Sequence, residues 1–314
     1  MYQKKSDILE SNAPNMAVLS EDRKEQIREI IFQDILQQEV ILSFSIQEII
    51  FSLRVYNYFN DKISIRYYKK NYEVLKKILI SKIRNLDRVY LTIENRTQFP
   101  FLNMGSVDIY SDENIAKEAM NFYKTKYRDL SVKQVSIEKD NVFATLFCLG
   151  VEHLRIDMGR YSIDIELEDI FDIPFQDARL IINPKLRFAM IDFLQESYWE
   201  GIYKAKQTTL LSKEEIMLRQ IKKSTYLVPV QLSKNRPDQV KEEDIKFSVY
   251  KNKEGTSFIP IFTDWFEFEK NYNKAEWQGL VTNLDKIKLL SKHMEGVVIN
   301  PSGENVYINQ DELI

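Results

Sequence analysis

Three short blocks of sequence occur twice in this chain, in the same order, and this repeat constrains the fold more than any other feature. The paired blocks are Arg88–Leu91 with Ser224–Leu227, Ile109–Asp112 with Ile261–Asp264, and Ile181–Pro184 with Val298–Pro301. Each block fits the boundary of a structural element. The second places Ser or Thr as an N-cap after a strand, and the third ends a buried strand because the residue before proline avoids the α region. The repeat therefore predicts two copies of one α/β module.

The chain has 314 residues, enough for two domains, and its pattern of apolar residues changes once along it. Helical spacing begins after Ser20, the expected N-cap of a first helix, and strand-like alternation begins at Arg88. The expected fold class is α+β, with an N-terminal helical region and two tandem modules whose mixed sheets are flanked by helices. The expected parts are a flexible tail at 1–19, a helical region at 20–84, a first module at 85–200, a connecting helix at 201–223 and a second module at 224–314.

Residues 152–169 alternate between aliphatic and charged side chains and predict a half-buried β-hairpin. Met158 and Gly159 at its centre form a candidate two-residue turn. That turn predicts three cross-strand pairs: His153 with Asp164, Leu154 with Ile163, and Arg155 with Ser162. The first copy of the repeat has more residues between its second and third blocks than the second copy has. We therefore interpret the hairpin as an insertion in the first, diverged module.

Residues 224–314 resemble the SseB domain. The resemblance is carried by three motifs in order: Tyr226–Val230, Phe258–Asp264 and Gly296–Pro301. Residues 88–200 resemble it loosely, with Ser111 in place of Thr263 and Asp108 in place of Pro260. The family takes its name from a serine-sensitivity phenotype, and some members are described as secretion-associated. The resemblance implies an α/β fold and a bacterial cytoplasmic protein, but it implies no reaction and no catalytic residue.

The residue types that carry most enzyme and metal chemistry are scarce. The chain has one cysteine and two histidines, so a zinc site would need mostly carboxylates, contrary to the preference of zinc for nitrogen and sulfur. Cys148 lies in an apolar run, where a thiol usually packs as a small hydrophobe, and His153 lies on the charged strand face. Neither GxGxxG nor GxxxxGK[ST] occurs. We therefore expect no catalytic residue, no metal and no cofactor.

Charge is distributed unevenly, although the net charge is only −3. Residues 62–88 hold nine Lys or Arg against two acids, and residues 152–177 hold eight acids against two arginines. The basic segment could bind RNA through its tyrosines, but these fall on the buried stripe of the helix. A solvated helix face, or docking on the acidic hairpin of the same chain, is the favoured interpretation. Nucleic acid is therefore not an expected partner.

No segment predicts a membrane span. The most apolar stretch, residues 40–53, is shorter than the roughly 20 residues that a span requires. Residues 1–20 lack the apolar run of a signal peptide. The cytoplasm is the expected location.

The function expected from these observations is that of a non-enzymatic protein-interaction module, an adaptor or regulator that binds another protein. Consecutive Trp265 and Phe266 cannot both face one side of a helix, so one of them is expected at the surface. The candidate partner-binding residues are Asp164, Glu166, Glu168, Trp265 and Phe266. One alternative is a chaperone or immunity-type binder dedicated to one secretion-system or toxin partner, docking on the acidic hairpin. A second is a carboxylate-dependent enzyme that uses Asp157 and His153.

Overall fold

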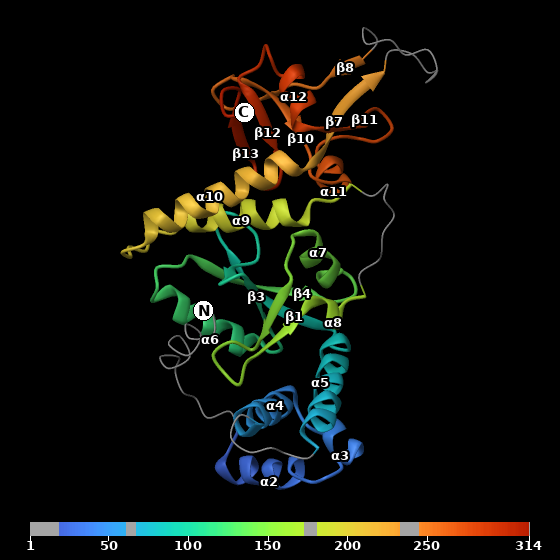
Figure 1. Cartoon of the computed structure of the whole chain (residues 1–314), viewed down its shortest axis with the longest axis vertical. Coiled ribbons are helices and arrows are strands. Elements are labelled where there is room, and N and C mark those ends of the chain that lie inside the picture. Colours follow the sequence, from blue (N-terminus) through green and yellow to red (C-terminus); the bar gives the residue numbers. More distant parts are fainter. Residues whose placement is uncertain (1–18, 61–66, 173–180, 233–244, 314) are drawn as a thin grey trace. The chain divides into compact units, whose positions relative to one another are not determined.

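The computed structural model describes residues 19–60, 67–172, 181–232 and 245–313, and the chain divides into two compact units (Figure 1). The first unit comprises residues 1–147, 151–173 and 199–201, and the second comprises 148–150, 174–198 and 202–314. Both contain helices and mixed sheets, which confirms the α+β class. Almost all of the predicted tail at 1–19 lies outside the described residues.

The described part of the first unit begins with helices, as the sequence predicts for residues 20–84. They are α2 (Glu21–Ile31), α3 (Gln38–Leu42), α4 (Ile46–Asn60) and α5 (Tyr68–Arg84). Ser20 caps α2 by accepting a hydrogen bond from the backbone N–H of Arg23 at 3.2 Å. The Arg23 side chain in turn pairs with Glu48 at 2.6 Å, which connects α2 to α4. The predicted helical region is therefore part of the first unit.

A six-stranded sheet follows the helices in the first unit. Its strands are β1 (Arg88–Glu94), β2 (Leu102–Asn103), β3 (Ser106–Tyr110), β4 (Leu130–Ser136), β5 (His153–Ile156) and β6 (Ile163–Glu166). The strand order is β4-β1-β3-β5-β6, with β2 beside β3. Only β3 and β5 run parallel, so the sheet is mixed. The connecting helices are α6 (Glu113–Lys124), α7 (Val142–Cys148) and α8 (Leu167–Ile170).

The second unit also combines helices with parallel and antiparallel strand pairs. It starts with two helices, α9 (Pro184–Tyr198) and α10 (Lys206–Lys223). Its strands are β7 (Thr225–Leu232), β8 (Ile245–Phe247), β9 (Tyr250–Lys251), β10 (Ser257–Ile261), β11 (Gln278–Asn283), β12 (Gly296–Ile299) and β13 (Val306–Asn309). They form two sheets, β13-β12-β10-β9 and β11-β7-β8, joined where Leu227 and Phe262 exchange backbone hydrogen bonds of 2.9 Å. The connecting helices are α11 (Trp265–Glu269) and α12 (Leu284–Leu290).

The two units share the order of their strand pairings. Antiparallel β1 and β4 correspond to β7 and β11, parallel β3 and β5 to β10 and β12, and the hairpin β5–β6 to β12–β13. Ile109 lies beside Ile156 in the first unit, and Ile261 lies beside Ile299 in the second. The second sequence block therefore marks equivalent strands. Asp108 and Pro260 also occupy equivalent positions, next to Arg155 and Val298 respectively.

The third sequence block does not mark equivalent positions, and that part of the prediction is wrong. Ile182 lies outside any strand, and Asn183 precedes α9 of the second unit. The residue equivalent to Asn300 is Asp157, because each follows the second parallel strand with positive φ (47° and 55°). Pro184 starts helix α9, whereas Pro301 follows Asn300, a turn residue with left-handed backbone. The first module therefore does not extend to residue 200, since residues 181–198 belong to the second unit.

The hairpin is present, but its predicted register and its description as an insertion are both wrong. The observed pairs are His153 with Glu166, Leu154 with Ile165, Arg155 with Asp164, and Ile156 with Ile163. The register differs from the prediction by two residues, a shift that keeps every side chain on its predicted face. The connection is longer because Asp157 starts a left-handed turn. The second unit has the same connection between Ile299 and Val306, so the hairpin is a shared element.

The first block is displaced by a single residue. Tyr90 lies opposite Tyr110, whereas Leu227 lies opposite the equivalent Phe262. Tyr90 therefore corresponds to Leu227, whereas the repeat predicted from the sequence pairs Tyr90 with Tyr226.

Helix α9 supplies part of the core of the second unit. Leu186, Ala189 and Met190 pack with Met217, Ile221 and the sheet residues Tyr226 and Ile299. We expect a fragment of residues 181–314 to unfold cooperatively on heating, whereas a fragment of residues 202–314 shows no cooperative transition. Losing even one such side chain costs about 2–5 kcal/mol, against a total stability of about 5–15 kcal/mol.

Far-UV circular dichroism during a thermal ramp distinguishes the two fragments. Equal midpoints for both would show that α9 is not part of this core.

Candidate functional site

The predicted acidic residues lie together on the surface of the first unit. Asp164 and Glu166 are exposed on β6, and Glu168 is exposed in α8. Arg155 donates to Asp164 at 2.8 Å, and His153 lies 2.8 Å from Glu166. Two of the three carboxylates are thus paired with side chains of the neighbouring strand. Their role in binding a partner stays a prediction.

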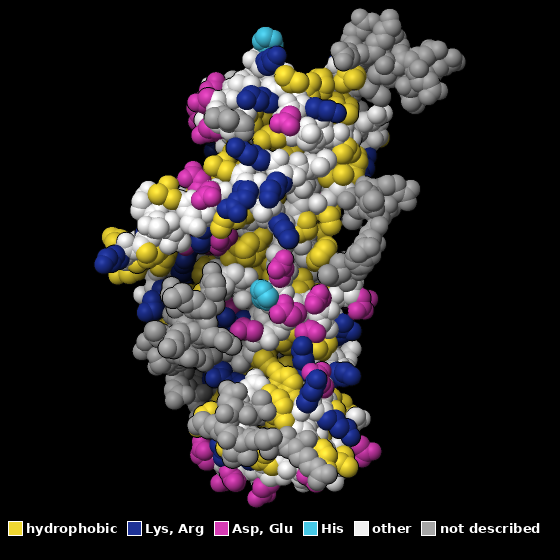
Figure 2. Space-filling view, in the orientation of Figure 1, with side chains coloured by type: hydrophobic (Ala, Val, Ile, Leu, Met, Phe, Trp, Pro, Cys, Tyr) yellow, Lys and Arg dark blue, Asp and Glu magenta, His cyan; other side chains and the backbone are white. Residues whose placement is uncertain are grey.

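The two predicted aromatic residues point to different environments at the start of α11. Trp265 packs against Phe268 at 5.2 Å between ring centroids and lies over Gly279, where an added Cβ would come within 2.6 Å of the indole. Phe266 is 65% exposed, with the Lys270 ammonium 4.5 Å from its ring centroid. Hydrophobic side chains and lysines or arginines lie intermingled on the visible face of the second unit (Figure 2). Phe266 is therefore the surface aromatic, and Trp265 fixes the helix that carries it.

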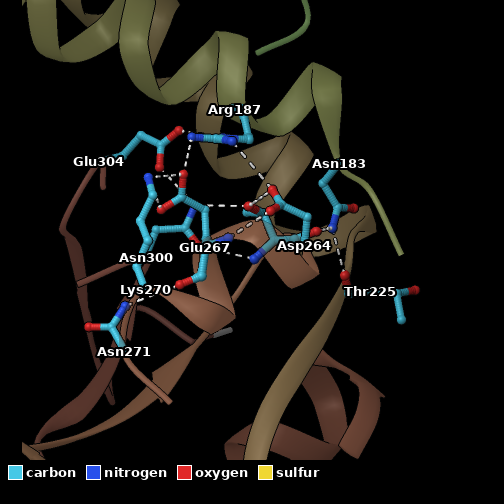
Figure 3. A network of polar contacts seen from close by, with 10 residues as sticks. Asn183, Arg187, Thr225, Asp264, Glu267, Lys270, Asn271, Asn300 and Glu304 are labelled. Atoms are coloured by element: carbon cyan, nitrogen blue, oxygen red, sulfur yellow. Dashed lines mark hydrogen bonds and ion pairs between the residues drawn. The ribbon is translucent and has the colours of Figure 1, made fainter. Parts of the chain in front are cut away.

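The most connected polar cluster of the second unit lies where the parallel strands β10 and β12 end (Figure 3). Crevices at the carboxyl ends of parallel strands are common binding sites in α/β proteins. Thr263 follows β10 and Asn300 follows β12. The Thr263 N–H donates to Asn300 Oδ1 at 3.0 Å, and Asn300 Nδ2 donates to Thr263 Oγ1 at 2.8 Å. Asn300 Nδ2 also donates to Glu304 at 2.7 Å, which connects this lock to the acidic side chains beside it.

Arg187 enters this cluster from α9 (Figure 3). Its side chain is only 3% exposed, and its guanidinium lies 2.7 Å from Glu304, 2.5 Å from Glu267 and 3.4 Å from Asp264. Asp264 also caps α11 by accepting from the Glu267 N–H at 2.9 Å. We call Arg187, Asp264, Glu267 and Glu304 the arginine clamp.

Burial and charge oppose each other in the arginine clamp. Burial lowers the pKa of Arg187, but the carboxylates of Glu304, Glu267 and Asp264 raise it above the ordinary value. Burial raises the pKa of Glu267, and Arg187 opposes that rise. Lys270 adds a second cation, 2.8 Å from Glu267. The guanidinium donates to all three carboxylates, so the clamp connects α9 to the start of α11 and to the turn after β12.

The equivalent strand ends of the first unit hold a smaller version of the same lock. Asp157 Oδ1 accepts from the Ser111 N–H at 2.8 Å, and Oδ2 accepts from Ser111 Oγ at 2.8 Å and from Gln47 Nε2 at 2.6 Å. Gln47 lies in α4, so a helix outside the sheet again contributes a side chain. Burial raises the pKa of Asp157. Because three donors bind this carboxylate and His153 pairs with Glu166, the two residues do not form a free acid–base pair.

A second buried acid lies in the middle of the first sheet. Asp108 accepts from Tyr123 at 2.7 Å and from Asn103 at 3.3 Å, and its Oδ1 has no hydrogen-bond partner among the described residues. Burial raises the pKa of Asp108 to about 6, opposed by the positive charge of Arg155. The sequence comparison identified this position only as the counterpart of Pro260. The available signal was a charged residue between the apolar Val107 and Ile109.

Cys148 and the basic helix fit the simpler interpretations. Burial raises the pKa of the Cys148 thiol, which opposes formation of a reactive thiolate. In α5, Lys76 pairs with Asp169 at 2.6 Å, and Arg84 donates to the backbone carbonyl of Asp169 at 3.1 Å. The basic helix therefore docks on α8 of the same unit. Among the described residues, no group of three or more His, Cys, Asp or Glu could hold a metal ion.

Sequence reasoning missed Arg187, which lies in a helix that it assigned to the first module. The arginine is 77 to 117 residues from its acidic partners, so no local pattern connects them. The only local signal was an arginine at a position of α9 that faces the apolar side, between Leu186 and Ala189.

The fold and the clamp define an α+β unit in which a helix pair covers a mixed sheet and fixes its strand ends. Residues 207–313 match the family model of the SseB protein N-terminal domain. The resemblance found in residues 224–314 is thus confirmed, and the match extends back into α10 but leaves α9 outside. Comparisons with curated proteins and with solved structures found no match. None of the described helices is long and apolar enough to cross a lipid bilayer.

We expect Arg187→Ala to destabilise the protein by about 3–5 kcal/mol, because three buried carboxylates would lose their guanidinium. Chemical denaturation followed by tryptophan fluorescence measures the change. Lys213→Ala is the control, since Lys213 pairs with Asp192 and Glu196 at a site that keeps contact with solvent. That variant should cost about 1 kcal/mol or less. Equal losses for the two variants would contradict the assignment.

Asp108→Asn should change the pH dependence of stability. The folded-state pKa of Asp108, about 6, lies above its ordinary value of 3.8, so folding favours the protonated form. Stability is therefore lost as pH rises from about 4 to about 6, by an amount on the order of 3 kcal/mol. The asparagine variant lacks this loss and should exceed the parent in stability above pH 6, with the difference disappearing near pH 4.

Denaturant midpoints measured across this pH range test the prediction. Parallel profiles for parent and variant would show that Asp108 does not titrate in this window.

Proposed function

We propose that the protein is a non-enzymatic interaction module, an adaptor or regulator that binds another protein in the bacterial cytoplasm. The SseB N-terminal domain at residues 207–313 supports the family context of this proposal. The bacterial and cytoplasmic parts rest on the family resemblance and on the composition of the chain.

The observation that carries the proposal is the exposed position of the Phe266 ring on a well-packed helix. Its ring is 65% exposed, although Trp265 and Phe268 on the same short helix pack into an aromatic cluster with Leu227 and Phe262. The ring is therefore held on a rigid base, with Lys270 over one face. Pre-ordered aromatic side chains of this kind dominate the binding energy of protein interfaces.

The absence of an enzymatic role is supported by the way the polar clusters are used. The arginine clamp and the Asp157 lock bind side chains of their own chain, and their hydrogen bonds fix helices to strand ends. Cys148 has a raised thiol pKa, as burial dictates. These groups contribute to folding, and the exposed aromatic residue contributes to binding.

The shared pairing order supports a further part of the proposal, that the two units arose by duplication of one module. The position of Glu267 corresponds to Ile115 in the first unit, if the equivalence of Thr263 and Ser111 is extended along the helix. The first unit would then keep the lock but not the acidic clamp. Two such units give an adaptor two different surfaces.

The alternative, a chaperone or immunity-type binder for one secretion-system or toxin partner, would use the acidic face. Arg155 and His153 already pair with Asp164 and Glu166, which reduces the charge that this face offers to a partner. The surface around Phe266 is therefore the better supported docking site.

Phe266→Ala should weaken binding of the partner by about 30-fold, because truncation of an interface hot spot costs about 2 kcal/mol or more. The partner is first captured by affinity purification of the full chain from native lysate with cross-linking, and its affinity is then measured with purified components.

Leu289→Ala is the matched control, since Leu289 is 62% exposed in α12 and does not belong to the aromatic cluster. Unchanged affinity for Phe266→Ala would remove this surface from consideration. A parent protein that captures no partner would refute the adaptor proposal.

A further inference from the structure

The strand β11 forms one end of its sheet, in the order β11-β7-β8. Among the described residues, no strand pairs with its outer edge. Such an edge presents unpaired N–H and C=O groups that can template pairing with another chain. The two central side chains of β11 are aliphatic and exposed, Leu280 at 37% and Val281 at 50%.

The equivalent edge of the first unit is protected, and the strand registers allow a residue-by-residue comparison. In β4, Lys133 and Gln134 lie opposite Leu91 and Tyr90. In β11, Leu280 and Val281 lie opposite Val228 and Leu227, which are the residues equivalent to Leu91 and Tyr90.

Lys133 and Gln134 are exposed, as are their counterparts in β11. A lysine on an edge strand is a common means of blocking edge-to-edge pairing. One copy of the fold therefore carries this protection, and the other carries two aliphatic residues at the same positions.

The two ends of β11 differ in charge. Lys222 and Lys223 lie at the end of α10, beside the Asn283 end of β11, because Asn283 pairs with Thr225. Lys286 lies in the first turn of the following helix α12, together with Asp285. These three lysines are exposed and make no ion pair within the described part of the chain. Among the described residues at the Gln278 end, Glu276 is exposed and makes no ion pair, while Lys274 and Glu269 pair with each other.

We propose that β11 pairs antiparallel with β11 of a second copy of this chain, which joins the two sheets across a two-fold axis. A two-fold axis perpendicular to the sheet places a central residue, Leu280 or Val281, opposite its own copy. The antiparallel direction brings the lysine-rich end of each strand beside Glu276 of the other. A parallel pairing would place the lysine-rich ends together, which like-charge repulsion opposes.

This pairing does not depend on the adaptor proposal, and it is measured on the purified chain alone. The full chain is examined by sedimentation equilibrium over a wide range of concentration. We expect a reversible dimer, with twice the mass of the monomer, that weakens as salt screens the charges at the strand ends. A parent that stays monomeric at every concentration would overturn the proposal, whatever partner the chain captures from a lysate.

The double variant Leu280→Lys with Val281→Gln copies the residues that protect β4. We expect it to weaken the dimer at least about tenfold, since cross-strand apolar pairs are replaced by facing lysines, at an unchanged melting temperature. Leu289→Lys is the control and should leave the dimer unchanged, because Leu289 is exposed on α12 and not on the strand. A double variant that dimerises like the parent would place the interface elsewhere and overturn the proposal.

A charge exchange tests the direction of pairing. Glu276→Lys alone should weaken the dimer, and the combination with Lys286→Glu should restore it, because the two positions face each other only in the antiparallel arrangement.

Hydrogen exchange provides the last measurement, with slower exchange of β11 amides expected at high protein concentration. Protection of these amides only on addition of another protein would identify a foreign strand as the occupant and overturn the second-copy assignment.

Discussion

A hydrogen-bonded lock between the ends of two parallel strands organises both halves of this molecule. In each unit an Asn or Asp with positive φ ends the second strand and binds the Ser or Thr that ends the first. Left-handed backbone is costly for most residues, and asparagine and aspartate tolerate it because their side chains can bond locally. The lock fixes where the following turn begins, and hence the register of the hairpin after it. A helix from outside the sheet then binds the lock or a carboxylate beside it, through Gln47 in one unit and Arg187 in the other.

The two units stabilise similar strand ends with different electrostatics. In the second unit, one guanidinium pairs with three carboxylates that are costly to bury without a cation, and Lys270 pairs with one of the three. In the first unit the carboxylate of Asp157 takes the place of the Asn300 amide, and hydrogen-bond donors stabilise that carboxylate. The first unit also buries Asp108 in a strand where the second has proline. The two units therefore bury different charged groups on equivalent strands and at equivalent strand ends.

Local sequence patterns predicted the individual helices and strands well. They predicted less well which strands and side chains lie next to one another. The N-cap at Ser20, the hairpin and the second sequence block follow from short-range rules, and all three are present. The third block gave a wrong prediction because two aliphatic residues followed by Asn-Pro fit both the start of a helix and the end of a strand. Only the tertiary structure distinguishes the two cases. The hairpin register was wrong by two residues since alternation fixes the face and not the partner. Arg187 could not be assigned at all, because its acidic partners lie far along the chain. The sequence predicted that either Trp265 or Phe266 lies at the surface but could not say which one. In the structure Trp265 packs on Gly279, and Phe266 is the exposed residue.

The position of α9 also bears on how such a domain can be inherited. The family match begins inside α10, downstream of the helix that carries the guanidinium. A recombination event at that boundary would transfer the acids of the clamp with Lys270 beside Glu267 but without Arg187, and the recipient would have to supply a cation at the position of Arg187. Exchange is far less disruptive upstream of residue 181, where the helix pair and the sheet move together. The unit that holds the arginine clamp together is thus longer than the stretch that matches the family model, because α9 supplies the guanidinium.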